Sequence, residues 1–396
     1  MKKMIAGLFG AALLSGVAFA DVGAPTPSAK DLSKMVEKVN YVETDVAGVR
    51  LNGYVDVGYI YNFTGDPVSQ RVGTDGANGG SFLVNAVKLT IDKPLNNKNE
   101  WQAGFRTDLM FGRDAGTLNG NWWSSSASEL FLEQAYVNFR APIGNGLDIK
   151  AGKFTTWLGY EVIERPANLN ITYGQMYTYL PSTMTGLALE YPLCNTADVG
   201  FAIGNASGDW NLDDRYAVMG TLNLKVPGGN ANWRNSVYYI WDSFYDTATN
   251  DHGNSVIYDT NVNWAPKFTN GKLLLGAAFD LGYAQNTFGG VNRGSTIIGA
   301  AGYAKYQFTS IFSLAGRVDY VHVDDPMAFN SLNVWASNFG GAPAARDGWS
   351  ATLTAGFNVV ENLLIRAEYR MDIGNNVTID DGDVAHTFAV QAVYTF

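Results

Sequence analysis

The side chains from which an enzyme or a metal site is usually built are scarce in this chain. It has three histidines, His252, His322 and His386, which lie far apart in the sequence, and one cysteine, Cys194. A single cysteine excludes an internal disulfide, a C-x-x-C-H haem attachment site and a cysteine-rich metal centre. We therefore predict no catalytic residue, no metal site and no cofactor.

Ionisable side chains are arranged differently: they alternate with apolar residues, or they gather in one long segment. Residues 158–181 contain Glu161, Glu164 and Arg165 together with several tyrosines. Charges at the narrowest part of a water-filled pore set its ion selectivity. If strands enclose such a pore, we expect this segment to fold into it and to meet mixed charges on its wall. The alternative is that the segment caps the pore from outside, with its tyrosines packed on neighbouring loops.

The candidate wall charges come from stretches in which charged and apolar residues alternate. The candidate pore-lining or constriction residues are Arg106, Asp108, Glu161, Glu164, Arg165, Arg317, Asp319, Arg366, Glu368 and Arg370. Acidic and basic residues are nearly balanced on the predicted wall, and the acidic excess falls in long polar connections, for example at Asp213, Asp324 and Asp380. An acidic entrance concentrates cations within a Debye length of about 8 Å, which predicts a weak cation preference. The alternative is that these acids only solvate the surface or bridge divalent ions to lipopolysaccharide.

The element that would position these charges is a β-strand with two different faces. The last twelve residues place Phe388, Val390, Ala392, Tyr394 and Phe396 on one face and mostly small or polar residues on the other. Period-two alternation indicates a strand with different surroundings on its two sides. Outer-membrane barrels have strands of this kind, with aromatic residues at the membrane interfaces.

The same pattern recurs from residue 49 onward. We count about sixteen strands, over residues 49–63, 82–92, 100–112, 129–140, 147–157, 182–191, 197–205, 215–226, 232–242, 254–265, 271–284, 294–308, 311–323, 348–359, 362–373 and 385–396. Most are near or above the roughly 9–11 residues that a tilted membrane-spanning strand needs. Short turns alternate with long connections, as periplasmic turns alternate with extracellular loops. The predicted fold is all-β: a transmembrane antiparallel β-barrel of about sixteen strands, of bacterial outer-membrane type.

The N-terminus predicts export. A basic start and an apolar run precede an A-x-A cleavage sequence that ends at Ala20, so residues 1–20 are predicted to be a signal peptide. We expect residues 21–48 to form a periplasmic extension, either with a short helix or as a loosely ordered segment, and residues 49–396 to form the barrel. The formal net charge of −10 argues against a nucleic-acid partner.

Several stretches resemble the putative OmpL-like beta-barrel porin family, also called beta-barrel porin-2. The resemblance is carried by Leu-Asn-Gly-Tyr-Val-Asp at 51–56, by Glu-Gln-Ala-Tyr-Val at 133–137, by Lys-Ala-Gly-Lys-Phe-Thr-Thr-Trp-Leu-Gly-Tyr-Glu-Val-Ile at 150–163, and by Pro-Ser-Thr-Met-Thr-Gly at 181–186. It runs from about residue 49 to the C-terminus. It implies an outer-membrane porin whose substrates are generally undefined, and it supplies no catalytic residues.

Together these features predict a porin of the bacterial cell outer membrane, through which small hydrophilic solutes and ions diffuse passively and which residues 158–181 narrow. The expected partners are outer-membrane lipid and lipopolysaccharide, and the barrel assembly machinery through the terminal strand that ends at Phe396. A homo-oligomer is also considered, although the sequence shows no interface for it. Two alternatives remain open: a barrel sheath for a periplasmic partner such as a multihaem cytochrome, and a structural or adhesive surface protein.

Overall fold

The computed structural model describes residues 42–43, 48–63, 80–118, 130–205, 216–227, 229–246, 251–288, 291–324, 347–374 and 384–396. The predicted signal peptide, the predicted helix of the extension and most acidic residues of the long connections lie outside these ranges. Most of the described residues belong to β-strands. Among the helices in these ranges, none is long and apolar enough to span a membrane.

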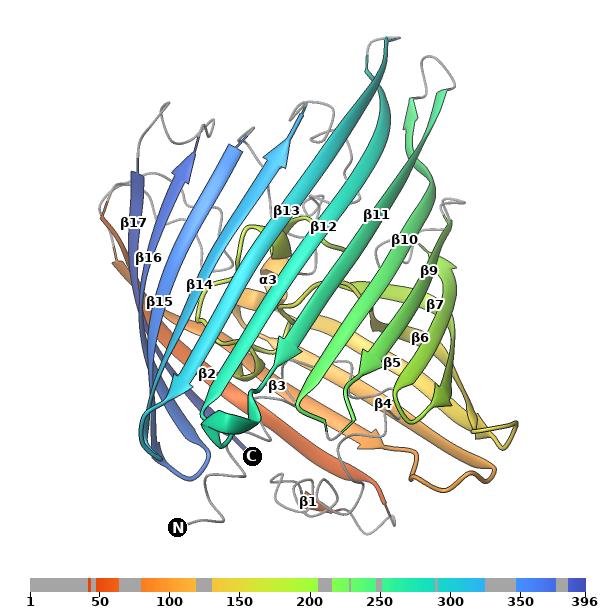
Figure 1. The fold of residues 1–396 in the computed structure, drawn as a ribbon, viewed down its shortest axis with the longest axis horizontal. Helices are drawn as coiled ribbons and strands as arrows, with labels where there is room; N and C mark the ends of the chain where they lie inside the picture. The colour runs from red at the N-terminus through yellow and green to blue at the C-terminus, as the bar shows by residue number, and fades with distance from the viewer. Residues whose placement is uncertain are drawn as a thin grey trace.

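One antiparallel sheet contains all the strands of the described residues. They are β1 (Val42–Glu43), β2 (Arg50–Asn62), β3 (Gly80–Lys93), β4 (Gln102–Phe111), β5 (Leu130–Ala141), β6 (Leu147–Thr155), β7 (Thr183–Cys194), β8 (Ala197–Asn205), β9 (Tyr216–Lys225), β10 (Ala231–Asp246), β11 (Asp251–Trp264), β12 (Leu273–Phe288), β13 (Val291–Gln307), β14 (Phe312–Val323), β15 (Asp347–Val360), β16 (Leu363–Gly374) and β17 (Val384–Thr395). The short β1 pairs with the start of β2, and β2 to β17 follow one another around a ring (Figure 1). The prediction of about sixteen spanning strands is confirmed, because β2 to β17 form a closed barrel.

The terminal strand closes this barrel. β17 pairs with β2, and Gly53 and Phe396 exchange both main-chain hydrogen bonds, with N···O distances of 2.9 and 3.0 Å. Only a glycine suits position 53, because a Cβ there would lie 2.1 Å from the carbonyl oxygen of Lys88. The aromatic end of the chain is therefore part of the wall.

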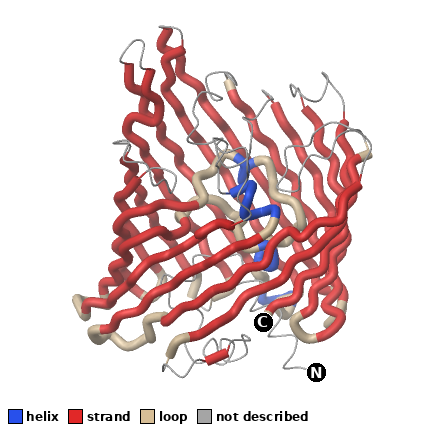
Figure 2. Tube along the Cα trace, turned by 180° about the vertical axis from the view of Figure 1, so that it is seen from behind, coloured by secondary structure: helices blue, strands red, loops and turns tan. Residues whose placement is uncertain are grey.

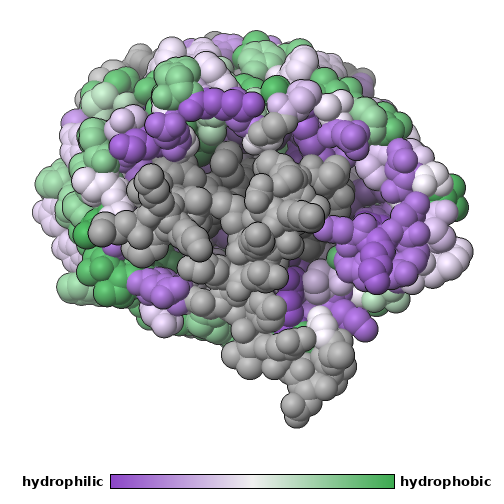
Figure 3. Space-filling view, turned by 60° about the horizontal axis from the view of Figure 1, so that its bottom comes forward, coloured by the Kyte–Doolittle hydropathy of each residue, from purple (hydrophilic) through white to green (hydrophobic). Residues whose placement is uncertain are grey.

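Each strand separates an apolar outer surface from a polar interior. Along β17, Phe388, Val390 and Tyr394 are exposed, whereas Gln391 is buried. Figure 3 shows hydrophobic residues on the outer flank and hydrophilic residues around the rim at the end where the termini lie. A globular protein in water shows the opposite arrangement, whereas a barrel with lipid outside and a polar lumen needs this one.

The alternation slips where β-bulges interrupt the ladder. Asn85 and Ala86 of β3 are both buried where the register with β2 shifts, and Glu133 and Gln134 of β5 are both buried where the register with β4 shifts. A bulge adds one residue to one strand and redirects the side chains around it. As a result, two consecutive side chains of each strand are buried.

Two segments leave the wall and lie inside the ring of strands (Figures 1 and 2). The helix α3 (Arg113–Leu118) follows β4. Residues 156–182, here called the inner loop, connect β6 to β7 and contain the 3-10 turns η1 (Arg165–Ala167) and η2 (Met176–Thr178). A further turn, η4 (Lys267–Thr269), joins β11 to β12. Apolar residues of α3 and of the inner loop pack with inward-facing wall residues in the buried clusters of the barrel.

Candidate functional site

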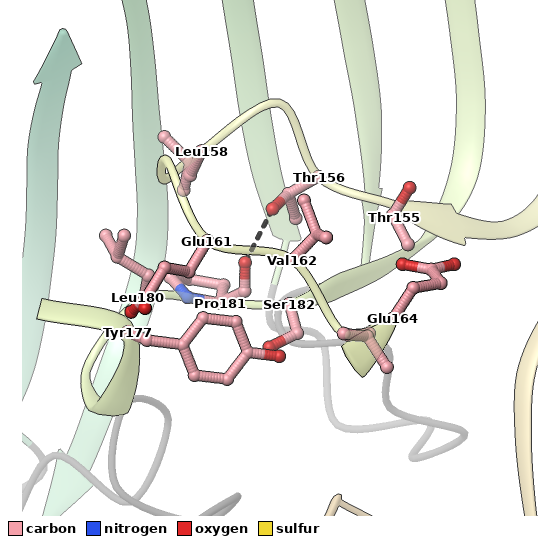
Figure 4. Close-up of a pocket in the computed structure, with 11 residues that line it drawn as sticks. Thr155, Thr156, Leu158, Glu161, Val162, Glu164, Tyr177, Leu180, Pro181 and Ser182 are labelled. Atoms are coloured by element: carbon pink, nitrogen blue, oxygen red, sulfur yellow. Dashed lines mark hydrogen bonds between the residues drawn. The ribbon is translucent and has the colours of Figure 1, made fainter. Parts of the chain in front are cut away.

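The two ends of the inner loop lie side by side. The N–H of Thr156 donates to the carbonyl oxygen of Ser182 at 3.0 Å. The Thr156 hydroxyl donates to the carbonyl oxygen of Pro181 at 2.6 Å, as drawn in Figure 4. Beyond this base the loop reaches β10, where the Ser236 hydroxyl donates to the carbonyl oxygen of Trp157 at 2.8 Å. The loop thus starts and ends at one place on the wall and extends across the interior between these ends.

Three buried wall arginines hold the main chain of the inner loop. Arg317 on β14 and Arg366 on β16 donate to its carbonyl oxygens at 2.7–3.2 Å, and Arg370 on β16 does the same. The acceptors are the carbonyl oxygens of Arg165, Asn168, Asn170, Thr172 and Tyr173. Hydrogen bonds from a charged donor are stronger than neutral ones. These three guanidinium groups therefore fix the path of the loop backbone.

Glu368 completes this attachment with the opposite charge. Its carboxylate accepts hydrogen bonds from the N–H groups of Ile171 and Thr172, at 2.5 and 2.9 Å, and from the hydroxyls of Thr172 and Thr354, at 2.6 and 2.7 Å. The side chain is only 2% exposed. One carboxylate therefore satisfies two consecutive amides of the inner loop.

We predict that Glu368→Gln loosens this part of the loop, because a neutral amide has only one oxygen to accept from these donors. A hydrogen bond to a charged group contributes about 1.5–3 kcal/mol. Hydrogen–deuterium exchange of a peptide that covers residues 168–175 should become faster. Glu361→Gln, in the turn between β15 and β16, is the matched control and should leave exchange unchanged. Equal exchange in Glu368→Gln and wild type would contradict the prediction.

Glu161 links the inner loop to β14. Its carboxylate accepts from Arg317 at 2.6 Å and from the N–H of Gly174 at 2.6 Å. Arg317 also pairs with Asp319 at 2.8 Å, and Asp319 accepts from the N–H of Gln175 at 3.1 Å. Burial raises the pKa of the Glu161 carboxyl above its ordinary value, although Arg317 acts in the opposite direction. Three of the predicted residues therefore form one chain of charges.

Glu164 joins a second group on β3, β4 and β5, here called the Lys88 cluster. The Lys88 ammonium lies 2.6 Å from Glu164, 2.8 Å from Glu133 and 3.1 Å from Asp108. Arg106 pairs with Asp108 at 3.0 Å. Within the described residues, these three carboxylates form the only group of three or more acidic, histidine or cysteine side chains whose ligand atoms lie close enough together to hold a metal ion. The ammonium group of Lys88 already contacts all three.

Arg165 joins the inner loop to α3. Its guanidinium donates to both carboxylate oxygens of Asp114 at 2.5 and 2.6 Å, and lies 3.4 Å from Asp56 of β2. All three side chains are buried. Asp114 does not follow from the sequence pattern, because it lies in a helix, outside the alternating strands. Asp56 occupies an inward position of an alternating strand, so the pattern marks it.

The tyrosines of the inner loop pack inside the barrel. Tyr160 stacks on Tyr303 of β13, with ring centroids 3.9 Å apart, and Tyr173 stacks on Tyr177 at 3.7 Å. Stacked aromatic pairs add about 0.5–1.5 kcal/mol beyond the area that they bury. These contacts stabilise the loop against the wall and within itself.

A small pocket, partly open to solvent, lies beside the inner loop. Its lining is Thr155, Thr156, Leu158, Glu161, Val162, Ile163, Glu164, Tyr177, Leu180, Pro181 and Ser182. Figure 4 shows Glu161 and Glu164 pointing to opposite sides. They reach Arg317 and the Lys88 cluster, respectively.

All ten candidate residues take part in the contacts described above. They fall into four groups according to what they contact, and charges of both signs occur within the groups. Arg106, Asp108 and Glu164 belong to the Lys88 cluster. Glu161, Arg317 and Asp319 form the chain of charges to β14. Arg366, Glu368 and Arg370 hold the inner loop, and Arg165 binds α3. Two partners, Lys88 and Glu133, were absent from the ten candidates. Both are inward-facing strand residues, so the alternation contains a signal for them, although the bulge obscures it at Glu133.

A family model described as "Putative beta-barrel porin-2, OmpL-like" matches residues 48–396. This match covers the barrel and the inner loop. No curated protein matches the chain.

Solved structures share the fold at low sequence identity. The outer membrane channel DcaP of Acinetobacter baumannii superposes with a TM-score of 0.62 at 12% identity, covering 89% of this chain and 99% of that one. An anion-selective porin from Comamonas acidovorans gives 0.61 at 8% identity, covering 88% and 99%. OmpF of Salmonella typhi in complex with daunomycin gives 0.55 at 12% identity, covering 90% and 100%. Identities this low show the likeness of fold alone.

Proposed function

The chain belongs to the OmpL-like beta-barrel porin-2 family, and from this premise we propose that it is a diffusion porin of the bacterial outer membrane. Small hydrophilic solutes and ions would cross it passively, through a lumen that residues 158–181 narrow. Barrels of this strand number leave an aqueous channel when nothing fills them. No chemical step and no cofactor are part of the proposal.

The observation that carries this proposal is the attachment of the inner loop to the wall by buried charges. Arg317, Arg366, Glu368 and Arg370 bind its backbone from β14 and β16, while Lys88 binds Glu164 from β3. A loop held on several sides inside the barrel would lie in the path of any solute that crosses it. It also leaves less room for a folded protein, so it disfavours the alternative of a sheath for a periplasmic cytochrome.

We propose a weak cation preference, set by the ten candidate pore-lining or constriction residues together with the acidic connections outside the described ranges. Three carboxylates surround Lys88, with Arg106 as the second cation. Negative groups at a constriction favour cations. The proposed partners are outer-membrane lipid, lipopolysaccharide and the barrel assembly machinery, which would recognise the strand that ends at Phe396. We also propose that the chain forms a homo-oligomer, and we assign no interface to it.

The selectivity can be tested with the double substitution Glu161→Gln and Glu164→Gln. We expect the cation-to-anion permeability ratio to fall toward or below unity, because Arg317 and the Lys88 cluster each lose one negative partner. The measurement is the reversal potential of purified protein in planar bilayers under a salt gradient. Glu361→Gln is the control. An unchanged reversal potential in the double variant would place the selectivity elsewhere.

A further inference from the structure

Two aspartates face each other across neighbouring strands on the inner surface of the barrel. Asp259 of β11 and Asp280 of β12 are register partners. Both side chains are completely buried. Their carboxyl groups are in hydrogen-bonding contact with each other. Neither aspartate takes part in the network formed by the ten candidate residues.

The protein supplies donors to only part of this pair. The Asn261 amide donates to Oδ1 of Asp259 at 3.0 Å, and the N–H of Gly159 donates to the same carboxyl. The Tyr179 hydroxyl donates to Oδ2 of Asp280 at 2.7 Å. Oδ2 of Asp259 and Oδ1 of Asp280 are buried without a hydrogen-bond partner among the N–H and O–H groups of the described residues. A buried, ionised oxygen without a donor is costly, so something must satisfy these two atoms.

The surrounding charges do not neutralise both carboxylates. The cation that acts on Asp259 is Arg234 of β10, which also interacts with Glu190 and Asp198. On β13 the register partner of Asp280 is Gly299, which carries no charge. From the inner loop, Tyr179 faces the pair and contacts Asp280. Tyr303 of β13 in turn interacts with Tyr179. Two carboxylates in contact cannot both ionise in a buried site, because like charges repel strongly there.

We propose that Asp259 and Asp280 share one proton, and that this proton site fastens both ends of the inner loop. Asp259 binds Gly159, near the start of the loop, and Asp280 binds Tyr179, near its end. Burial and the neighbouring Asp280 raise the pKa of the Tyr179 hydroxyl, so it remains a donor over the range in which carboxyl groups titrate. Loss of the shared proton places two negative charges in contact. They then turn away from each other, and the contacts to the loop are broken.

The proton itself can be detected without any channel measurement. Infrared spectra of the folded protein should contain the C=O stretching band of a protonated carboxylic acid at neutral pH. Asp259→Asn and Asp280→Asn, each nearly isosteric, should both lose the part of this band that belongs to the pair, which appears in the difference spectrum of wild type minus variant; any other protonated carboxyl cancels in that difference. The exposed Asp324→Asn is the control and should retain the band. Absence of the band in wild type, or a difference spectrum without this band for both variants, would overturn the proposal.

The effect of the shared proton on the inner loop is measured separately, as channel current, and this measurement rests on the proposed porin function. Open-channel current should become noisier as pH rises in wild type. This pH dependence should be lost in Asp280→Asn, and weakened in Tyr179→Phe, which keeps the carboxyl pair but cuts its link to the loop. If no channels are seen but the infrared band is present, the proposed porin function is contradicted, whereas the proposed shared proton is supported. If wild type lacks the band and its current noise responds instead to a chelator, then a metal cation and not a proton joins the two aspartates, and the proposal is overturned.

Discussion

Removal of residues 160–179 should increase the single-channel conductance severalfold. The inner loop extends from its base at Thr156 and Pro181 to contacts on β14 and β16, so its removal widens the narrowest part of the proposed pore. The two ends lie within hydrogen-bonding distance of each other, so a short glycine linker from Gly159 to Leu180 can join them without strain on the wall. The measurement is conductance in planar bilayers at a fixed salt concentration.

The wall should tolerate this deletion. Arg317, Arg366 and Arg370 lose their carbonyl partners, but water enters the space and hydrates them, so no charge is left buried and dry. Heat-modifiable migration in gels, which reports a closed barrel, is the folding control. A folded deletion variant with the conductance of wild type would show that this segment does not limit the pore. If wild type and the deletion variant both fold but neither shows channel openings, the structural or adhesive alternative is favoured.

Replacement of Lys88 by methionine should give the second large effect, a loss of stability. Lys88 is 2% exposed and contacts Asp108, Glu133 and Glu164 within 3.1 Å. Without the ammonium group, three carboxylates face one another, and Arg106 pairs with one of them, Asp108. Removing one partner of a buried ion pair costs about 3–5 kcal/mol. Denaturant unfolding of the detergent-solubilised barrel, followed by tryptophan fluorescence, measures the change in the free energy of unfolding.

The exposed pair on the same hairpin provides the matched control. Lys98 lies 3.9 Å from Glu100 in the turn between β3 and β4. Exposed ion pairs contribute little, so Lys98→Met should leave the unfolding midpoint where it is. Adding Glu164→Gln to Lys88→Met should restore part of the lost stability, since one repelling carboxylate is neutralised. Equal midpoints for Lys88→Met and Lys98→Met would mean that water already solvates the cluster.

The sequence by itself determined the barrel. Apolar residues such as Phe388 alternate with polar residues such as Gln391, because one face of each strand meets lipid and the other faces the lumen. This difference in surroundings determines the type of every second residue. Turn residues and long connections then fix the order of the strands around the ring. The same pattern marked Arg317, Asp319 and the charges of β16 as inward, because inward positions follow directly from the alternation.

Only the tertiary structure decided which charges meet. Lys88 binds Glu164, and Glu161 binds Arg317, because barrel closure and the path of the inner loop bring together residues that lie far apart in the chain. Period-two alternation gives the face of a side chain but neither its height on the wall nor its partner. The bulge at Glu133 and the helix that carries Asp114 break the pattern, so their contributions became visible only when the strands were paired and the loop was packed between them.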